Sequence, residues 1–468
     1  MKILYIGAGF VGTCSAAVAA DSGHQVLVYD VDEQKIAQLN TFGRDNIEAC
    51  LFEKGLGDLL VRNRERIEFA ADYEKVIRYL DSVNAIFLCL PTPEIGETGE
   101  SNLSYYTQAL STLVPHLKTR LSGMQSNHIV LINKSTVPIE MVDVTQCMLA
   151  EAGVINVGVV SNPEFLVEGR AIEGSLKPDR IVVGAWTQKD FEVMRSLYRR
   201  FVDAPDVQYI EVNPKEAAAG KLLANFMLFN KLALCFDVVG RVSELFPNIQ
   251  YEQLRKILAS DARIGSWGLY DSLYAGGSCF IKDARSLSFQ LRAQGVEPAL
   301  VDQVHLSNKK QLERFLNRIM DVAGQQVDGK TIALLGTAFK RDTNDVRNSP
   351  SIDIVRFFVA RGVGKIFVHD PVAVENFLNV FAHESEILSH LEVVSHEFEA
   401  ARQADIVIVS TDWPQFRGLA DMLISETSHR PIIADGRRML QHRYADLCSA
   451  GYTVVAVGSP NYTISTLI

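Results

Sequence analysis

The sequence predicts an α/β protein with two Rossmann-like, doubly wound domains joined by a long central helical region. Short apolar strand patterns alternate with helical patterns up to about residue 212, and the same alternation restarts at about residue 330. Such alternation is typical of a parallel sheet covered by helices on both faces. Residues 213–320 carry helical patterns without strands. We therefore expect three parts, 1–212, 213–320 and 321–468.

The composition limits the classes of protein to consider. The chain has 468 residues and a net charge of −10, whereas a dedicated nucleic-acid binder usually carries a basic face. Its seven cysteines are odd in number and scattered, which does not fit a disulfide framework. No signal-peptide pattern opens the chain, and no apolar run approaches the ~18 residues of a membrane span. We therefore expect a cytoplasmic protein without a nucleic-acid or membrane partner.

A glycine-rich turn follows the first strand pattern, "MKILYIGAGFVG", and opens a helix of small residues. Gly7 permits the tight turn, Gly9 lets the backbone approach a pyrophosphate, and Gly12 allows the helix to pack against the sheet. The phosphates would lie at the positive N-terminus of that helix. Asp30 ends the next strand, where a carboxylate accepts hydrogen bonds from ribose hydroxyls and repels a 2′-phosphate. The pattern favours NAD over NADP; the alternative is a plain βα turn.

Polar residues follow two later strand patterns of the first domain. "HIVLINKSTVP" offers Lys134, Ser135 and Thr136, and "VGVVSNPEFLVEG" offers Glu164 and Glu168. The carboxyl ends of parallel strands face the ligand crevice of such sheets. We expect these side chains at that crevice, with a loose scatter of surface charges as the alternative.

One long helical pattern, "KEAAAGKLLANFMLFNKLALCFDVVGRVSELF", dominates the central region. Its apolar residues run nearly all around, which predicts that much of it is buried in protein. Lys221 and Asn225 are four residues apart and share one face of the helix. The small and apolar neighbours of Lys221 indicate a packed environment, where a lysine needs an anionic partner or a negative charge that develops during a reaction. The alternative is a solvated surface lysine.

The stretch "YAGGSCFIKD" places a thiol behind two glycines. Gly276 and Gly277 would let the chain approach a ligand closely, and Ser278 is the expected N-cap of the following helix. Cys279 would then lie in the first turn, where the helix dipole favours a thiolate. Asp283 is four residues further on, on the same face. We expect a nucleophile paired with a carboxylate; the alternative is a buried structural cysteine.

The second α/β domain echoes the first. "KTIALLGTAFK" and "KIFVHDP" occupy the places of the first two strand patterns, but two of the three glycines are gone, so we expect a different ligand. Lys340, Arg347 and Arg437 stand at or near strand ends in this domain. A basic cluster of this kind suits phosphate groups.

Taken together, the motifs resemble the UDP-glucose/GDP-mannose dehydrogenase family over nearly the whole chain. They are, in order, "GAGFVG", "TP" at 92–93, "KSTVP", "NPEFLVEG", "GKLLAN", "RIG", "GGSCFIKD", "AFKRDTNDVR" and "DGRR". The resemblance implies an NAD-dependent oxidoreductase that turns the C6 alcohol of UDP-glucose into UDP-glucuronate through a cysteine thiohemiacetal and thioester. It also implies an NAD-binding first domain, a central region for dimerisation and catalysis, a nucleotide-sugar-binding last domain, and a role in polysaccharide biosynthesis.

The resemblance further implies roles for individual residues. Around the reacting carbon it implies Cys279, Lys221, Asp283, Asn225, Glu164 and Thr136. For NAD it implies Gly7, Gly9, Phe10, Val11, Gly12, Asp30, Lys35, Thr92, Thr136, Glu168, Lys282 and Arg347. For the nucleotide sugar it implies Glu164, Phe165, Leu166, Glu168, Lys221, Asn225, Arg263, Tyr270, Gly276, Phe280, Phe339, Lys340 and Arg437.

The family likeness also implies a homodimer or larger homo-oligomer, in which Arg263 reaches the neighbouring subunit's site, and no metal ion. Two residues depart from the family pattern. Asn133 stands where many relatives have an acid, and Pro91 stands where a small or polar residue is common. Both departures would reshape loops on the cofactor side without removing a catalytic group.

Three alternatives stay open. The same chemistry could act on GDP-mannose or another nucleotide sugar, although "GGSCFIKD" points away from N-acetylated sugars. A two-electron β-hydroxyacid dehydrogenase also has a Rossmann domain and a helical region, but it needs no cysteine and leaves the second α/β domain unexplained. A catalytically silent nucleotide-sugar-binding protein would not need Cys279, Lys221 and Asp283 together.

Overall fold

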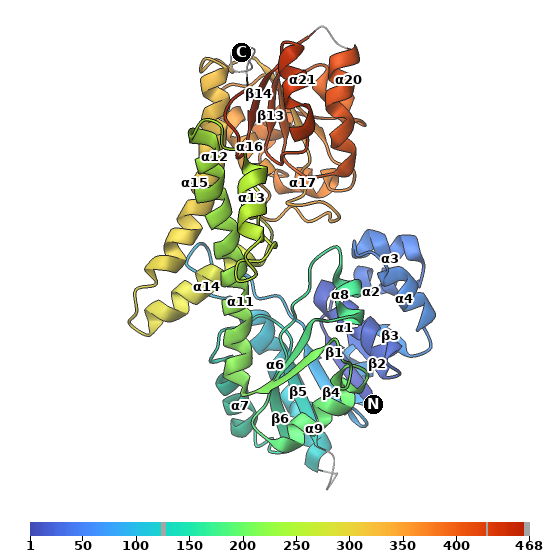
Figure 1. Ribbon diagram of the computed structural model, residues 1–468. Helices are drawn as coiled ribbons and strands as arrows, with labels where there is room; N and C mark the ends of the chain where they lie inside the picture. The colour runs from blue at the N-terminus through green and yellow to red at the C-terminus, as the bar shows by residue number, and fades with distance from the viewer. Residues whose placement is uncertain (123–127, 427–428, 463–468) are drawn as a thin grey trace. The chain divides into compact units, whose positions relative to one another are not determined.

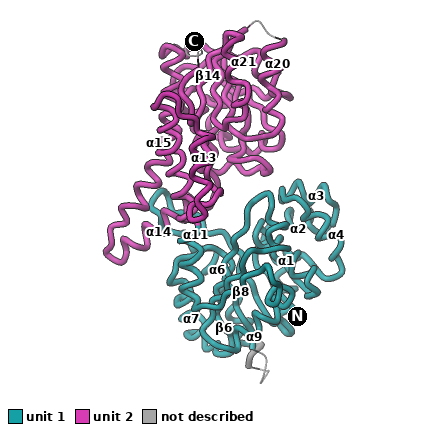
Figure 2. The backbone as a smooth tube through the Cα atoms, viewed as in Figure 1, with its two compact units in different colours: residues 1–224 teal, residues 225–468 magenta. Residues whose placement is uncertain are grey.

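The computed structural model describes residues 1–122, 128–426 and 429–462. The chain forms two compact units, Met1–Ala224 and Asn225–Ile468 (Figures 1 and 2). The boundary falls inside one helix, α11 (Pro214–Leu234). The division into three parts at residues 213 and 321 stays a prediction.

An eight-stranded sheet forms the centre of the first unit, in the order β3-β2-β1-β4-β5-β6-β7-β8 (Figure 1). Its strands are β1 (Lys2–Ile6), β2 (Gln25–Tyr29), β3 (Ile67–Ala70), β4 (Ala85–Leu88), β5 (Ile129–Asn133), β6 (Val157–Ser161), β7 (Arg180–Gly184) and β8 (Gln208–Val212). Strands β1 to β6 pair in parallel, as predicted. β7 pairs with β6 in the antiparallel direction, which corrects the expectation of a wholly parallel sheet. Because antiparallel neighbours can be joined at one edge, residues 162–179 stay at the carboxyl edge of the parallel strands.

Helices cover both faces of this sheet. They are α1 (Phe10–Asp21), α2 (Glu33–Asn40), α3 (Arg44–Cys50), α4 (Leu56–Arg62), α5 (Tyr73–Leu80), α6 (Ser104–Ser122), α7 (Met141–Glu151), α8 (Ala171–Leu176), α9 (Gln188–Leu197) and α10 (Arg199–Val202). Successive strand residues alternate between two cores, because side chains of a strand point to opposite faces. Ile3 and Tyr5 pack with α1, α4 and α8, whereas Leu4 and Ile6 pack with α5, α6 and α7. The first unit is therefore doubly wound, as predicted.

Helices fill the second unit up to residue 322. After α11 come η1 (Cys235–Val239, a π-helical turn), α12 (Gly240–Leu245), α13 (Tyr251–Ala259), α14 (Phe280–Ala293) and α15 (Ala299–Val322). Every residue from 214 to 322 is described, and none of them lies in a strand. The buried side chains of Phe229, Phe236 and Leu287 belong to the core of this helical part.

The helical run Pro214–Leu245 is less buried than its sequence predicted. Only 39% of its most apolar 18-residue window is buried, and Met227 and Leu245 are 71% and 67% exposed. By length and composition the run is apolar enough to cross a membrane, which corrects the expectation that no stretch approaches that length. A single helix of this kind is weak evidence for a span, since core helices of soluble proteins have the same composition.

A second sheet repeats the strand order of β1 to β6. Its order is β11-β10-β9-β12-β13-β14, and all its pairs are parallel. Its strands are β9 (Thr331–Leu335), β10 (Lys365–His369), β11 (Leu391–Val393), β12 (Ile406–Val409), β13 (Ile432–Asp435) and β14 (Thr453–Ala456). Its helices are α16 (Pro350–Val359), α17 (Val374–Val380), α18 (Ser385–His390), α19 (Glu397–Ala401), η2 (Pro414–Gly418), α20 (Leu419–Glu426), η3 (Gln441–Arg443) and α21 (Tyr444–Ser449). Ile332 and Leu334 face one core and Ala333 and Leu335 the other. The predicted second Rossmann-like domain is confirmed.

Candidate active site

The glycine-rich turn of the first unit has room for a ligand where the sequence predicted it. Gly7 has a φ of +105°, and a Cβ atom there would lie 2.2 Å from a backbone oxygen. A Cβ atom on Gly12 would lie 2.0 Å from the Gly7 carbonyl oxygen, whereas one on Gly9 would meet nothing within 4 Å. Helix α1 begins at Phe10 and Val11, both half-buried, without a side-chain cap. The free N–H groups of its first turn and the open space at Gly9 fit the pyrophosphate of NAD.

The acid at the end of β2 is held by the same turn. Asp30 accepts hydrogen bonds from the Ala8 N–H at 2.7 Å and from the Asp32 N–H at 3.0 Å. Lys35 Nζ lies 3.3 Å from Asp30 Oδ2 and balances its charge. Carboxylate oxygens accept more than one hydrogen bond each, so ribose hydroxyls can still bind here. The structure thus brings the predicted Asp30 and Lys35 together.

Hydroxyl groups tie the loops after β4 and β5 to each other. Thr92 Oγ1 donates to the Thr136 carbonyl oxygen at 2.8 Å. Ser135 Oγ donates to the Leu90 carbonyl oxygen at 2.7 Å and accepts from the Leu90 N–H at 2.8 Å. Thr136 lines a small cleft that Lys221 also lines. Thr92 and Thr136, both predicted to contact the cofactor, therefore stand at the carboxyl edge of the sheet, and Thr136 is next to Lys221.

Lys221 has the anionic partner that its packed surroundings required. Its Nζ lies 3.0 Å from Glu164 Oε1, and the two side chains are 5% and 12% exposed. Glu164 Oε2 accepts a hydrogen bond from the Leu166 N–H at 2.6 Å. The Phe165 ring lies under two cations, with Arg180 at 3.9 Å and Lys221 at 5.3 Å from its centroid. The predicted lysine therefore contacts two residues of the predicted "NPEFLVEG" loop, Glu164 and Phe165.

A residue that the sequence did not single out supports this loop. Glu53 is 1% exposed and accepts hydrogen bonds from the N–H groups of Gly169 at 2.9 Å and Ala171 at 2.6 Å. Glu168, predicted to contact both ligands, is half-buried in the same loop. No local pattern could reveal Glu53, because its partners lie 116 and 118 residues further along the chain.

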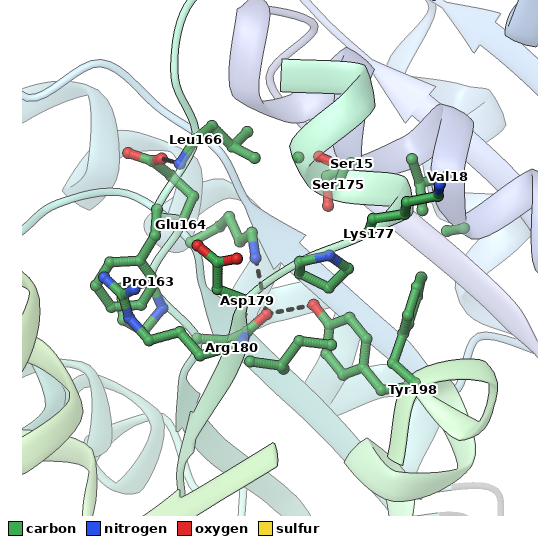
Figure 3. Close-up of a pocket in the computed structure, with 18 of the residues that line it drawn as sticks. Ser15, Val18, Pro163, Glu164, Leu166, Ser175, Lys177, Asp179, Arg180 and Tyr198 are labelled. Atoms are coloured by element: carbon green, nitrogen blue, oxygen red, sulfur yellow. Dashed lines mark hydrogen bonds between the residues drawn. The ribbon is translucent and has the colours of Figure 1, made fainter. Parts of the chain in front are cut away.

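A cavity of about 490 Å³ opens beside Glu164 in the first unit (Figure 3). Glu164 and Leu166 stand on one side of it and Val18 and Tyr198 on the other. Its exposed lining residues include Arg170, Glu173, Lys177 and Asp179, and its buried lining residues include Lys134 and Asn162. The cavity therefore leads from a charged rim to a polar, buried floor.

In the second unit, Cys279 stands at the start of α14 and Asp283 one turn further on. The thiol is exposed, and the Cys279 carbonyl oxygen accepts a hydrogen bond from the Asp283 N–H at 2.8 Å. Asp283 is 1% exposed and accepts from Asn225 Nδ2 and from Lys282 Nζ, each at 2.6 Å. Phe280 packs its ring on the core of the central helices. Both carboxylate oxygens of Asp283 are thereby fixed beside the thiol-bearing residue.

The expected N-cap of this helix is wrong by one residue. Cys279 itself occupies the N-cap position, and Ser278 precedes it with its Oγ 3.6 Å from the sulfur. The cause is the backbone hydrogen bond from the Asp283 N–H to the Cys279 carbonyl oxygen. As the first hydrogen bond of the helix, it starts the helix one residue later than a serine cap would. No side chain caps the first turn, so the positive end of the helix dipole favours negative charge at the thiol.

The expectation that Gly276 and Gly277 admit a ligand stays a prediction, and the structure shows a further reason for the two glycines. A Cβ atom on Gly276 would lie 2.3 Å from the Asn348 carbonyl oxygen. One on Gly277 would lie 2.8 Å from the Phe339 ring, and Gly277 has a φ of +85°. The two glycines therefore let the cysteine loop pack closely on the 339–348 loop, which brings the predicted Phe339 against it.

Two basic residues follow strands of the second sheet. Arg437, after β13, donates from Nη1 to Ser272 Oγ and from Nη2 to Asp412 Oδ1 at 2.6 Å. Burial acts to raise the pKa of Asp412, but the charge and hydrogen bond of Arg437 outweigh it and lower the pKa to about 2. Lys340, after β9, has its Nζ 5.5 Å from the Phe339 ring centroid. Asp412, which was not predicted from the sequence, thus orients Arg437, the arginine that is predicted to bind phosphate.

Three predicted residues stand at the surface of the second unit. Arg263 is 90% exposed and pairs with Asp261 at 2.6 Å. Arg347 is 66% exposed and pairs with Asp345 at 2.6 Å. Tyr270 is 47% exposed.

The acid of the second sheet that matches Asp30 is buried and bonded to more protein N–H groups than Asp30 is. Asp370 follows β10 and accepts hydrogen bonds from the N–H groups of Thr337 and Ala338 and from Trp413 Nε1 at 3.1 Å. A Cβ atom on Gly336 would lie 2.3 Å from Thr411. Protein N–H groups therefore occupy more of this carboxylate than of Asp30, which agrees with the expectation of a different ligand in this domain.

Three sequence models of one family match the chain in order. The NAD binding domain of the UDP-glucose/GDP-mannose dehydrogenase family matches residues 1–202, its central domain residues 215–310 and its UDP binding domain residues 333–442. The chain belongs to the UDP-glucose/GDP-mannose dehydrogenase family. As a member, it is an NAD-dependent oxidoreductase with a nucleotide-sugar substrate.

Named relatives cover almost the whole chain. UDP-glucose 6-dehydrogenase AglM of Haloferax volcanii is 33% identical over 449 residues, which are 95% of this chain and 98% of the relative. UDP-glucose 6-dehydrogenase TuaD of Bacillus subtilis is 30% identical over 463 residues, 98% of this chain and 93% of the relative. A solved UDP-glucose dehydrogenase from Pyrobaculum islandicum, 28% identical, has a TM-score of 0.82 and covers 94% of this chain and 95% of its own.

Family membership confirms the predicted family, fold and cofactor, while the roles of single residues stay predictions. Within the described ranges, no group of three or more His, Cys, Asp or Glu side chains could hold a metal ion. Besides Glu53 and Asp412, Asn162 was not predicted as a site residue, and Lys134 was expected at the crevice without a role of its own. Lys134 and Asn162 lie in the motifs "KSTVP" and "NPEFLVEG", but their hydrogen bond joins segments that are distant in sequence, so the motifs do not reveal the pairing.

Proposed function

We propose that the protein oxidises the C6 alcohol of UDP-glucose to UDP-glucuronate with two NAD, through a thiohemiacetal and a thioester on Cys279. The supporting observation is an exposed thiol at a helix N-terminus, one turn before a buried carboxylate that Asn225 and Lys282 hold in place. A dehydrogenase that releases a carbonyl needs no nucleophile. A four-electron dehydrogenase gains from one, because the covalent adduct keeps the aldehyde in place for the second oxidation.

The first oxidation requires a base for the C6 hydroxyl proton. Asp283 takes this role through a water, with Lys221 one helical turn from Asn225 on α11. Bound NAD supplies the hydride acceptor for both oxidations. The residues that hold it are the glycine turn and Asp30, together with Thr92 and Thr136 after the neighbouring strands.

The second oxidation starts with a carbon–sulfur bond. Cys279 Sγ adds to the aldehyde carbon, the carbonyl oxygen takes a proton, and Lys221 and Asn225 stabilise the charge that develops on that oxygen. Loss of the second hydride and of the hydroxyl proton leaves a thioester. Glu164 and Thr136 orient a water that attacks it, the carbon–sulfur bond breaks, and the carboxylate and the thiol are released.

The nucleotide end of the substrate is assigned to the second sheet. Lys340 and Arg437 stand at the carboxyl ends of β9 and β13, where cations suit a diphosphate. The two curated relatives at 33% and 30% identity carry the name UDP-glucose 6-dehydrogenase, which supports UDP-glucose as the sugar. GDP-mannose or another nucleotide sugar is the alternative substrate for the same chemistry.

A homodimer, or a larger homo-oligomer, in the cytoplasm completes the proposal. Met227, Leu234, Val238 and Leu245 are exposed at spacings of seven, four and seven residues, so they follow one face of the run α11–η1–α12. An exposed apolar face of this kind marks an interaction surface. The exposed Arg263 is the residue proposed to reach the partner's site.

Counting the NADH formed tests the chemistry. With limiting UDP-glucose and excess NAD we expect two NADH per sugar, UDP-glucuronate as product and little free aldehyde. One NADH with accumulating aldehyde would contradict the four-electron route. No NADH with UDP-glucose, but two per GDP-mannose, would keep the chemistry and replace the substrate.

A further inference from the structure

Lys134 is a buried cation that the proposed chemistry does not use. It follows β5 directly, is 8% exposed and lines the floor of the cavity beside Glu164. Its Nζ donates a hydrogen bond to Asn162 Oδ1 at 3.0 Å. Among the described residues its hydrogen-bond partner is thus a neutral amide rather than a carboxylate. A charge buried at such cost indicates a task other than stability.

The amide that Lys134 holds stands at the start of the Glu164 loop. Asn162 Oδ1 also accepts from the Tyr198 hydroxyl at 2.5 Å, and Asn162 Nδ2 donates to the Val182 carbonyl oxygen at 2.7 Å. Figure 3 shows the Tyr198 hydroxyl in this contact at the cavity floor. Asn162 precedes Pro163, which restricts its backbone, and Glu164 comes next. Lys134 therefore fixes the first residue of the turn that carries the carboxylate.

Two charged groups near Lys134, Glu164 and Lys221, belong to the proposed hydrolytic site. Burial lowers the pKa of Lys134 to about 8; Cys89 and Glu164 act to raise it, and Lys221 lowers it further. Tyr5 and Tyr198 line the same cavity, and burial raises the pKa of both hydroxyls. The remaining charged lining residues are Arg170, Glu173, Lys177, Asp179 and Arg180. Lys221 pairs with Glu164, and Lys134 lines the same cavity as Glu164, so two ammonium groups stand around this carboxylate.

We propose that Lys134 is a positioning residue for Glu164: through Asn162 it fixes the turn that carries the carboxylate, and its positive charge joins that of Lys221 in balancing it. The inference rests on the proposed role of Glu164 in hydrolysis of the thioester. Lys134 then matters for the last step more than for either hydride transfer. Because the hydrogen bond to Asn162 survives loss of one proton from the amine, deprotonation removes the charge and keeps the geometry.

Two substitutions separate these contributions. Lys134→Met keeps an unbranched stem and removes both charge and donor. Lys134→Arg keeps the charge at every accessible pH. Lys177→Met, at the exposed rim of the same cavity, is the matched control. Each protein is mixed with UDP-glucose and NAD, and samples are quenched in acid. Intact-protein mass spectrometry of these samples measures the thioester directly, and absorbance follows NADH.

For Lys134→Met we expect thioester breakdown to slow by about 10- to 100-fold, the size of effect that losing the outer-shell partner of a metal ligand has on activity. The first NADH should form at close to the wild-type rate, the adduct should accumulate, and the KM for UDP-glucose should change little. Lys177→Met should match the wild type. Equal slowing of every step, or unchanged breakdown in Lys134→Met, would overturn the inference.

The pH profile keeps the test decisive if Lys134→Met folds poorly. In the wild type, breakdown of the thioester should fall as the pH rises through about 8, where Lys134 loses its charge. In Lys134→Arg this fall should vanish, and its persistence there would sink the inference. Absence of any thioester, in the wild type and in Glu164→Gln alike, would instead overturn the covalent route itself and the inference with it.

Discussion

Lys221 Nζ and Glu164 Oε1 lie 3.0 Å apart, in a salt bridge whose side chains are 5% and 12% exposed. One partner belongs to the helix α11 and the other to the loop after β6. Breaking a buried pair from one side leaves the other charge uncompensated and costs about 3–5 kcal/mol. Neither residue can therefore be changed without disturbing the other, and tests of one must include a reading of stability.

Glu164→Gln keeps the shape of the side chain and removes the charge that faces Lys221. We expect a lower melting temperature and slow hydrolysis, so that a thioester on Cys279 accumulates after two NADH have formed. Melting curves measure the stability, and intact-protein mass spectrometry of acid-quenched samples measures the thioester. Glu173→Gln, an exposed glutamate on α8, is the control. Full turnover in Glu164→Gln would remove Glu164 from the hydrolytic step.

Cys279→Ser tests the nucleophile. A serine hydroxyl is a poorer nucleophile than a thiol at neutral pH, so we expect the reaction to stall after the first oxidation or to leave a slowly hydrolysed ester. NADH per UDP-glucose should fall from two towards one. Cys147→Ser, at another exposed cysteine, should behave like the wild type. Wild-type production of acid by Cys279→Ser would exclude covalent catalysis at this position.

The two Rossmann-like folds could be predicted from sequence because their signals are local. Strand, turn and helix follow each other within about 30 residues in such units, and Gly7, Gly12 and Asp30 stand in the structure where that pattern requires them. The orientation of β7 escaped prediction, since strand patterns carry no direction. The second acid, Asp370, looked like Asp30 in sequence, and only the structure shows that protein N–H groups occupy it.

The chemistry of the site was less accessible to sequence analysis than the fold. Lys221 needed an anion, and Glu164 could be listed as a nearby candidate but not paired with it. Gly276 and Gly277 were assigned to a ligand, whereas Phe339 and Asn348 pack against them. Such contacts join segments that are distant in the chain, and burial of a single lysine or glutamate leaves no periodic pattern.

Asp30→Ala should weaken the preference for NAD over NADP. The change removes the acceptor for ribose hydroxyls and leaves Lys35, now 3.3 Å from Asp30, available for a 2′-phosphate. Losing a hydrogen bond to a charged group costs about 1.5–3 kcal/mol, so kcat/KM for NAD should fall by about 10- to 100-fold. Steady-state kinetics with both cofactors measure the ratio, with the exposed Asp45→Ala as control. An unchanged ratio would place the ribose elsewhere.

Val238→Asp should weaken the proposed dimer. Val238 is 51% exposed on the apolar face of the run α11–η1–α12, and a carboxylate there would have to be desolvated in the interface. Light scattering during size-exclusion chromatography should show a smaller particle than the wild type. Val393→Asp places the same charge on β11 at a site that is 50% exposed and should leave the mass unchanged. A wild-type mass for Val238→Asp would remove this face from the interface.

Arg437→Ala should weaken UDP binding by about 10- to 100-fold, because a charge-assisted hydrogen bond to phosphate is worth about 1.5–3 kcal/mol. Asp412→Asn should weaken it less, since Arg437 loses its orienting partner but keeps its charge. The pKa of Asp412 is lowered to about 2, so Asp412 stays ionised at pH values where an ordinary aspartate is protonated. Its ion pair with Arg437 is lost only as the pH falls from about 4 towards 2. Titration of Asp412 should therefore leave the affinity for UDP constant between pH 6 and 8. Calorimetry with UDP alone checks all three statements, with Arg402→Ala, an exposed arginine at the end of α19, as control. Equal affinities of Arg437→Ala and Arg402→Ala for UDP would show that the diphosphate lies away from β13.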